Sequence, residues 1–299
     1  MTQQGIYILA NDFVIEASIA LVKSVRRWSP NADITLIPYN EQLSEIKKKL
    51  VSPFNLKIFE NPTFDNWFYP ILLHPELQKS RPSMLRKLAC WFGNYDRFLY
   101  IDTDIVVFED VTTHLNLLSE YEFLTADYQR NNVFRDVFPQ SMIEKFPMFD
   151  TRKVFNAGFF ASRKDALSKE VIVKELEFFS NNPSLFFQHY GDQSFLNYLV
   201  LKRGLTTVNL IDISGNVAGN WAGSPHFLQK EDYLLDGNQQ KLRFLHWAGF
   251  RISEEAPYWD IWRHYRYLGE ELPLPVKPPR PMSRLFNRLK TRLKGYFYK

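Results

Sequence analysis

Residues 97–108 read Arg97-Phe98-Leu99-Tyr100-Ile101-Asp102-Thr103-Asp104-Ile105-Val106-Val107-Phe108. Phe, Tyr, Ile and Val dominate this run, which has no Gly or Pro, and this composition is typical of a β-strand. Because the run is apolar at both alternating sets of positions, we expect a central strand buried between helices. Asp102 and Asp104 would share one face if the strand continued through them, because successive side chains alternate.

Two carboxylates this close resist joint ionisation unless a positive charge lies between them. Mg²⁺ and Mn²⁺ are the usual partners, since they prefer oxygen ligands and often bridge carboxylates to the phosphates of a substrate. The alternative is that Asp102 and Asp104 only end a strand and begin a turn, because Asp-x-Asp alone is a common tripeptide. Their position after an apolar strand favours the metal site.

The composition is that of a globular protein with many aromatic residues. The chain has 299 residues, of which 45% are hydrophobic, 23% charged and 16% aromatic, so some rings could stack on a nucleobase or a sugar. A single cysteine, Cys90, excludes an internal disulfide and fits a reducing compartment. The sequence shows neither a secretory signal nor a run of 18 apolar residues, so we expect a cytoplasmic protein.

The net charge of +4 is unevenly distributed. Residues 277–299 hold 8 of the 37 Lys and Arg residues and no acid, which leaves 29 bases against 33 acids, about −4, in the rest of the chain. We therefore expect no nucleic-acid partner. A Pro-rich linker precedes the basic segment, whose apolar residues lie near helical spacing, so it is either a peripheral membrane helix, on the inner membrane face, or a solvated tail.

The N-terminal part predicts a βαβ unit. Residues 5–10 and 34–37 have strand composition, and apolar residues between Ile15 and Trp28 recur at helical spacing. Such a unit starts a parallel sheet with a right-handed crossover, and its ligands bind beyond the carboxyl ends of the strands. Asn11 and Asp12 would lie at that edge, as would the two aspartates.

Further elements follow in order. We expect strands at 56–59, 122–127, 155–161, 208–213 and 242–246, helices at 41–50, 84–91, 164–179 and 193–203, an irregular stretch at 62–82 and an insertion, mobile or facing the acceptor, at 128–152.

Three polar positions each allow two interpretations. Asn156 before Ala157-Gly158 permits close approach of a ligand to the backbone, or it starts a strand with a bulge. Asp192 fits the N-cap of the helix at 193–203, which requires no function. His246 at a strand end is either a hydrogen-bonded group or a third ligand beside two carboxylates.

Trp247, Trp259 and Trp262 cluster in the C-terminal part of the sequence. They either pack a subdomain there or stack on carbohydrate.

Taken together, the motifs resemble the retaining glycosyltransferases of family 8, the group of glycogenin and the bacterial lipopolysaccharide galactosyltransferases. The resemblance covers roughly residues 5–262. It is carried by Lys87-Leu88-Ala89-Cys90-Trp91, Asp102-Thr103-Asp104, Phe155-Asn156-Ala157-Gly158, Asp192-Gln193 and His246-x-x-Gly249, in the family's order.

The resemblance implies a GT-A fold, an α/β architecture with a Rossmann-like, mixed and mainly parallel central sheet flanked by helices. The catalytic domain would span 1–270, and 271–299 would form the linker and tail. The activity implied is that of a hexosyltransferase that uses Mn²⁺ or Mg²⁺ and a nucleotide-diphosphate sugar, with UDP as the expected nucleotide, to modify a saccharide or glycolipid acceptor.

The resemblance also implies roles for single residues. The metal ligands would be Asp102, Asp104 and His246, and the catalytic pair beside the anomeric carbon would be Asp192 and Gln193. The donor would be held by Ala10, Asn11, Asp12, Lys87, Asp127, Asn156, Ala157, Gly158, Gly249 and Arg251.

One departure concerns the phosphate clamp. The family usually continues His-x-x-Gly-x-x-Lys-Pro-Trp, whereas Ile252 stands here in the lysine's place, with Arg251 beside it. Two other functions remain open: a catalytically impaired protein that binds nucleotide sugars, and a sugar nucleotidyltransferase. The second is disfavoured because no Gly-rich basic loop follows the first strand.

Overall fold

The computed structural model describes residues 2–126, 137–186, 191–214, 220–224 and 226–272. The strands are β1 (Gln4–Ala10), β2 (Ile34–Pro38), β3 (Lys57–Ile58), β4 (Arg97–Ile101), β5 (Ile105–Val107), β6 (Phe123–Thr125), β7 (Phe159–Arg163), β8 (Thr207–Asn209), β9 (Leu228–Lys230), β10 (Tyr233–Leu235) and β11 (Phe244–His246). The α-helices are α1 (Ile15–Trp28), α2 (Ser44–Ile46), α3 (Pro62–Leu72), α5 (Gln140–Lys145), α6 (Lys169–Asn181), α7 (Gly191–Arg203), α8 (Leu210–Ser214) and α9 (Trp259–Arg266).

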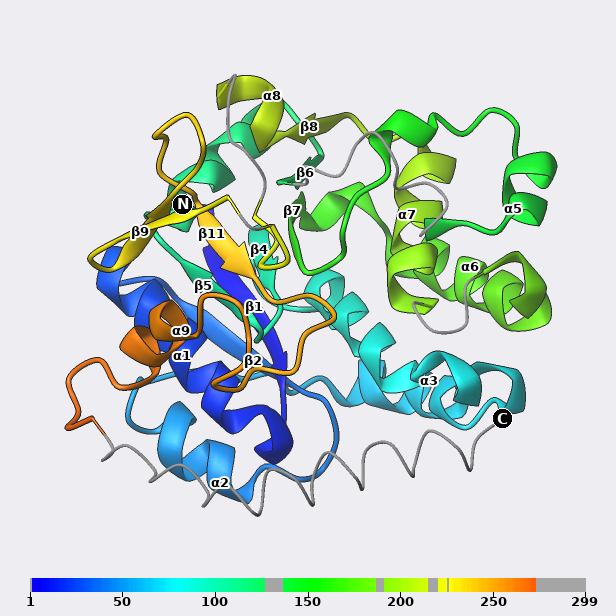
Figure 1. Cartoon of the computed structure of the whole chain (residues 1–299). Helices are drawn as coiled ribbons and strands as arrows, with labels where there is room; N and C mark the ends of the chain where they lie inside the picture. The colour runs from blue at the N-terminus through cyan, green and yellow to red at the C-terminus, as the bar shows by residue number, and fades with distance from the viewer. Residues whose placement is uncertain (1, 127–136, 187–190, 215–219, 225, 273–299) are drawn as a thin grey trace, which may run out of the picture. The chain divides into compact units, whose positions relative to one another are not determined.

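A seven-stranded sheet in the order β3-β2-β1-β4-β7-β6-β8 forms the centre of the fold (Figure 1). All neighbouring strands are parallel except β7, which runs antiparallel to both β4 and β6. The mixed, mainly parallel sheet that the family resemblance implies is therefore confirmed. The chain divides into two compact units, Met1–Leu268 and Gly269–Lys299.

Both faces of the sheet are buried, as the doubly apolar strands predict. Tyr7 of β1 and Tyr100 of β4 pack in one core cluster with α6 and α7. Ile8 of β1 and Leu99 of β4 point the other way, into a second cluster that includes Val22 of α1. Alternation along each strand thus divides the side chains between two helical layers.

The strand that begins at Arg97 does not continue through the two aspartates. β4 ends at Ile101 and a turn follows. β5 then leaves the main sheet and pairs antiparallel with β11. Asp102 and Asp104 therefore do not sit on one continuous strand, and they are brought together by a turn instead.

Two further local predictions are wrong. The stretch 62–82 is not irregular, since α3 begins there with Asn61, whose side chain accepts the Phe64 N–H, and with Pro62 in the first turn. The strand expected at 208–213 ends at Asn209, and α8 begins at the next residue, Leu210. Pro residues and β-branched residues were misleading in these two stretches, because capping and tertiary packing outweigh their intrinsic propensities.

The C-terminal part of the first unit packs on α1, and Figure 1 shows α9 beside that helix. Trp247 and Trp262 are buried there in one cluster with Ala20 of α1. Trp28 donates to the Tyr265 hydroxyl at 3.1 Å. The packing interpretation of Trp247 and Trp262 is therefore confirmed. Among the described residues, no helix is both long enough and apolar enough to cross a membrane.

Candidate metal and donor site

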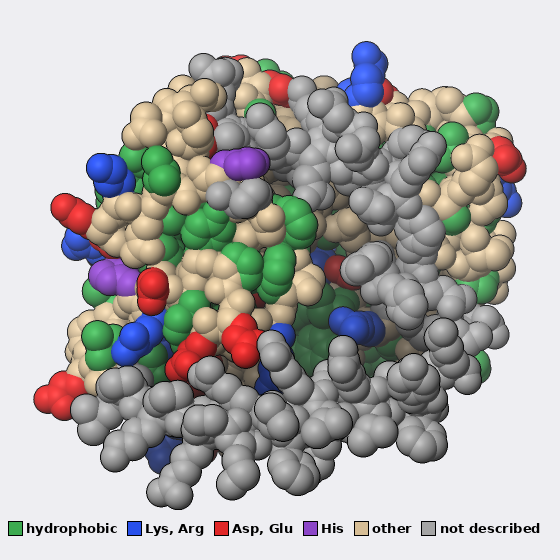
Figure 2. Space-filling model, in the orientation of Figure 1, with side chains coloured by type: hydrophobic (Ala, Val, Ile, Leu, Met, Phe, Trp, Pro, Cys, Tyr) green, Lys and Arg blue, Asp and Glu red, His purple; other side chains and the backbone are tan. Residues whose placement is uncertain are grey.

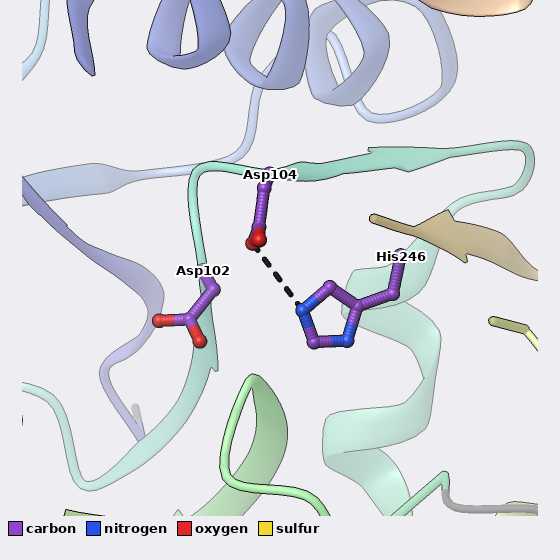
Figure 3. A group of neighbouring side chains, drawn as sticks. All are labelled: Asp102, Asp104 and His246. Carbon is purple, nitrogen blue, oxygen red and sulfur yellow. Dashed lines mark ion pairs between the residues drawn. The ribbon is translucent and has the colours of Figure 1, made fainter. Parts of the chain in front are cut away.

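Three side chains that could bind a metal meet at the carboxyl end of β4 (Figure 3). Asp102 follows β4, Asp104 precedes β5, and His246 ends β11. One ligand atom of each lies within 4.8 Å of the other two, and the His246 Nε2 is 3.3 Å from the Asp104 Oδ1. The β5–β11 register pairs Ile105 with His246, which places the imidazole beside an aspartate 142 positions earlier in the sequence.

The charges around this cluster favour a cation. Burial raises the pKa of Asp102; Lys87 acts against that rise and the Asp104 charge adds to it. Burial alone would raise the pKa of Asp104, but the His246 imidazole, a backbone hydrogen bond and the Lys87 charge together outweigh burial, and the pKa lies below its ordinary value. Burial alone would lower the pKa of His246, but the two aspartates outweigh burial and raise it. Two carboxylates and one imidazole form a donor set that suits Mn²⁺, so these residues fit a divalent metal.

Gly158 lies directly against two of the three candidate ligands, Asp102 and His246. Its carbonyl oxygen accepts the Asp102 N–H at 2.7 Å. A Cβ on Gly158 would lie 2.5 Å from the His246 Cε1 and 2.9 Å from the Asp102 Oδ2. Such contacts are too short for carbon, so the absence of a side chain at this position lets the three ligand groups approach one another.

We expect Gly158→Ala to weaken Mn²⁺ binding by at least about tenfold, because the methyl group must displace His246 or Asp102 from the cluster. Calorimetric titration with Mn²⁺ measures the change. Gly237→Ala is the matched control, since nothing lies within 4 Å of its Cβ position. Equal Mn²⁺ affinity in the two folded variants would contradict this role for Gly158.

A buried lysine joins the aspartates to a second acid. Lys87 lies in the 3-10 helix Pro82–Phe92 and is 1% exposed. Its Nζ lies 2.6 Å from the Asp192 Oδ2 and 3.8 Å from the Asp102 Oδ1, and it donates to the Ala157 carbonyl at 3.3 Å. Burial alone would lower the pKa of Lys87, but Asp102 and Asp192 outweigh it and the pKa is raised. Lys87 therefore stays charged at neutral pH.

The predicted sugar-site segment lies next to this lysine. The Asn156 Oδ1 accepts the Gly158 N–H at 2.8 Å, and the Gln193 Oε1 accepts the Ala157 N–H at 3.3 Å. Residue 192 is not the N-cap of α7, because the helix already begins at Gly191 and Asp192 lies in its first turn. The strand expected at 155–161 begins only at Phe159, so the segment is a turn rather than a strand.

The end of β1 approaches the same edge of the sheet. The parallel register pairs Tyr7 with Tyr100, so Asn11 follows β1 near the level of the aspartates on the neighbouring strand. Asn11 is 4% exposed and donates to Asn40 at 3.2 Å. Asp12 accepts the Ile46 N–H at 2.8 Å, so it also stabilises the short helix α2.

Of the remaining predicted positions, one is buried, two are exposed and one lies outside the described residues. Ala10 is fully buried, whereas Gly249 and Arg251 are exposed after β11. Gly249 has φ +80°, a conformation that favours glycine. Asp127 lies outside the described residues.

Sequence reasoning missed two aromatic residues, one in contact with Asp102 and one next to Asp12 in the sequence. Tyr100, read only as a strand residue, donates its hydroxyl to the Asp102 Oδ1 at 2.6 Å. Burial raises the pKa of that hydroxyl, so it remains a donor. Phe13, next to Asp12, is 79% exposed, which is unusual for a phenylalanine. No sequence pattern distinguishes these rings from the many that pack in the core. Figure 2 shows hydrophobic side chains gathered near the centre of the face drawn, with charged side chains next to them.

Comparisons with known proteins identify the family and the fold. The family model described as "Glycosyl transferase family 8" matches residues 6–251. The galactosyltransferase LgtC, solved with donor and acceptor sugar analogs, is 16% identical with a TM-score of 0.60, covering 91% of this chain and 98% of that one. No sequence among the curated proteins matches.

Two other solved structures share the fold. The bifunctional glycosyltransferase WbbM is 14% identical with a TM-score of 0.57, and the match covers 89% of this chain. It spans only 50% of the WbbM chain. Mouse xyloside xylosyltransferase 1 is 12% identical with a TM-score of 0.51, covering 69% of this chain and 84% of that one. The structural similarity supports the GT-A fold. At such low identity it carries no information on the substrates of this chain.

Proposed function

This chain belongs to glycosyl transferase family 8, and from that premise we propose that it is a metal-dependent retaining hexosyltransferase. The donor would be a nucleotide-diphosphate sugar, with UDP as its nucleotide, and the acceptor a glycan or a lipid-linked saccharide. The observation that carries the proposal is the approach of Asp102, Asp104 and His246 at the carboxyl end of the central strands. Ligands of α/β sheets bind at this edge.

Breaking the bond between sugar and diphosphate releases a negatively charged leaving group, which needs positive charge close by. A Mn²⁺ or Mg²⁺ ion held by Asp102, Asp104 and His246 would supply that charge. Gly249 and the exposed Arg251 would contact the diphosphate, with Arg251 replacing the lysine usual in the family. Lys87 is buried 3.8 Å from Asp102 and would orient the donor sugar beside the cluster.

The other predicted residues would hold the two ends of the donor. Ala10, Asn11 and Asp12 follow β1 and would contact the nucleoside, with the exposed Phe13 ring next to them. At the sugar end, hydroxyl groups would be bound by amide and carboxylate groups, namely those of Asp127, Asn156, Asp192 and Gln193. Ala157 and Gly158 would bring the backbone close to the sugar.

Retention of configuration requires one of two routes. Either the anomeric carbon undergoes two successive displacements, or the acceptor attacks it from the same face as the departing diphosphate. The Lys87 Nζ lies 2.6 Å from the Asp192 Oδ2, and the side-chain Oε1 of Gln193 accepts the Ala157 N–H, so neither group is poised as a nucleophile. We favour same-face attack. The acceptor oxygen bonds to the anomeric carbon as the bond to the diphosphate breaks, and a departing phosphate oxygen takes the acceptor proton.

Hydrolysis of a panel of UDP-, GDP- and ADP-linked hexoses, with and without Mn²⁺, tests this function. We expect slow release of sugar and nucleoside diphosphate from one donor class, only when metal is present. Tight binding of a nucleotide without turnover of any donor would favour the impaired binding protein instead. Release of pyrophosphate from a sugar phosphate and a nucleoside triphosphate would favour the nucleotidyltransferase.

We also propose that residues 277–299, which lie outside the described part, contact an anionic membrane surface on its cytoplasmic side. Their 8 basic residues and apolar spacing support this interpretation. Deleting 277–299 is expected to lower co-sedimentation with vesicles of anionic phospholipid at least about tenfold. Unchanged co-sedimentation would refute the membrane contact.

A further inference from the structure

Trp221 presents an unusually exposed ring beside the metal cluster. Its side chain is 40% exposed, although tryptophan is mostly buried in folded proteins. The segment around it pairs with the end of β11, since the His246 N–H donates to the Asn220 carbonyl at 2.7 Å and the Ala222 N–H to the His246 carbonyl at 2.9 Å. Trp221 is therefore the direct parallel partner of His246. Residues paired directly across strands project to the same face, so the indole lies on the side of the imidazole.

Three contacts fix the ring in place. The Trp221 Nε1 donates to the Ala248 carbonyl at 3.0 Å. The Phe250 ring packs against the indole, with centroids 5.8 Å apart and planes tilted by 42°. A Cβ on Gly223 would lie 2.4 Å from the indole, so only a glycine lets the ring occupy this position. An exposed side chain normally keeps its rotamer freedom, whereas this ring is ordered before any ligand arrives.

The position of Trp221 separates it from the proposed nucleoside site. β11 pairs with β5 on one edge and with the Trp221 segment on the other. The indole therefore lies across His246 from Asp104, whereas Asn11 and Asp12 follow β1, which neighbours β4 in the main sheet. A donor whose diphosphate is held at the cluster, with its nucleoside near β1, leaves the ring beside His246 for another ligand.

The chemistry of the ring indicates what that ligand is. The face of an aromatic ring is electronegative, and it attracts the weakly positive C–H groups on one face of a pyranose while excluding water. A ring held rigid by its own hydrogen bond keeps this face available for stacking. Building on the proposed transferase function, we propose that Trp221, supported by Phe250, is the platform on which the pyranose of the acceptor saccharide stacks.

The experiment measures how each enzyme divides a bound donor between transfer and hydrolysis. Methyl β-galactoside and methyl β-glucoside serve as acceptor probes, with the donor identified by the hydrolysis panel. We expect Trp221→Ala to lower the ratio of transfer to hydrolysis about tenfold, which corresponds to about 1.4 kcal/mol, by raising the acceptor KM. Trp221→Phe keeps a ring and should lose less. Leu228→Ala, which removes another exposed apolar side chain (53%), is the control and should match the wild type.

An unchanged ratio in Trp221→Ala would overturn the platform, as would a raised donor KM with the acceptor KM unaltered, because the ring would then serve the donor. A second readout needs no turnover: saturation transfer from the protein to the methyl pyranosides by NMR. It should be present in the wild type and lost in Trp221→Ala. If the wild type hydrolyses no nucleotide sugar, the proposed function fails, whereas the NMR result still decides whether Trp221 binds a saccharide.

Discussion

Asp104→Ala is expected to lower sugar transfer by at least about a thousandfold, or about 4 kcal/mol of transition-state stabilisation. The Asp104 Oδ1 lies 3.3 Å from the His246 Nε2, and a carboxylate oxygen of Asp104 lies within 4.8 Å of one of Asp102, so its removal leaves one carboxylate and an imidazole. These two groups alone would hold a divalent cation weakly. Initial rates of hexose transfer over a range of Mn²⁺ concentrations measure the effect.

Asp104→Asn is the matched variant for this prediction, because it keeps the shape of the side chain and removes its charge. We expect a loss similar to that of the alanine variant, partly restored by raised Mn²⁺. The Asp104 side chain is 35% exposed, so both variants should fold, and circular dichroism would verify this. Full transfer without metal dependence in Asp104→Ala would contradict the metal hypothesis.

Lys87→Met is expected to lower transfer by at least about a hundredfold and to destabilise the fold by about 3 kcal/mol. The methionine fills similar volume but leaves Asp192 and Asp102 without the ammonium that now lies between them. Chemical denaturation and transfer assays measure the two effects separately. Because the pKa of Lys87 is raised, its ionic contribution to stability is complete below 10.5 and is lost only as pH rises through the folded pKa.

The double variant Lys87→Met/Asp192→Asn separates electrostatics from packing. Removing the Asp192 charge together with the lysine should recover part of the lost stability, because one buried uncompensated charge is gone. Transfer should remain low, since both groups are proposed to hold the donor sugar. If the double variant were as unstable as the sum of the single variants, the 2.6 Å pair would contribute no coupling energy.

Much of the fold follows from periodicity in the sequence. The helix expected between Ile15 and Trp28 is confirmed at those residues, and the strands on either side form the predicted parallel pair. The doubly apolar run at 97–101 correctly indicated a strand covered on both faces. Such elements are predictable because the burial of their side chains repeats with the period of the backbone.

The break after Ile101 was not predictable from the same run. Ile105 and Val107 have strand composition, but the partner of β5 is β11, more than 130 residues later, and not the main sheet. Composition indicates that a strand forms and says little about which strand it pairs with. The position of α8 directly after β8 has the same origin in tertiary context.

The candidate site was also only partly predictable from the sequence. The acids at strand ends could be placed on one edge of the sheet from topology alone. The chemistry of His246 left two interpretations open, and the family resemblance favoured the third metal ligand, because no local pattern connects residues 104 and 246. Trp221 was missed because its importance depends on its 40% exposure and on its pairing with His246, and neither property is written in the composition around it.

Titration with Mn²⁺ followed by electron paramagnetic resonance, with and without UDP, tests the central claim most directly. We predict that the wild type binds one Mn²⁺ per chain, more tightly when UDP is present, and that His246→Ala and Asp104→Ala each weaken this binding at least about tenfold. Mn²⁺ binding of equal strength in the wild type and both variants would contradict the account.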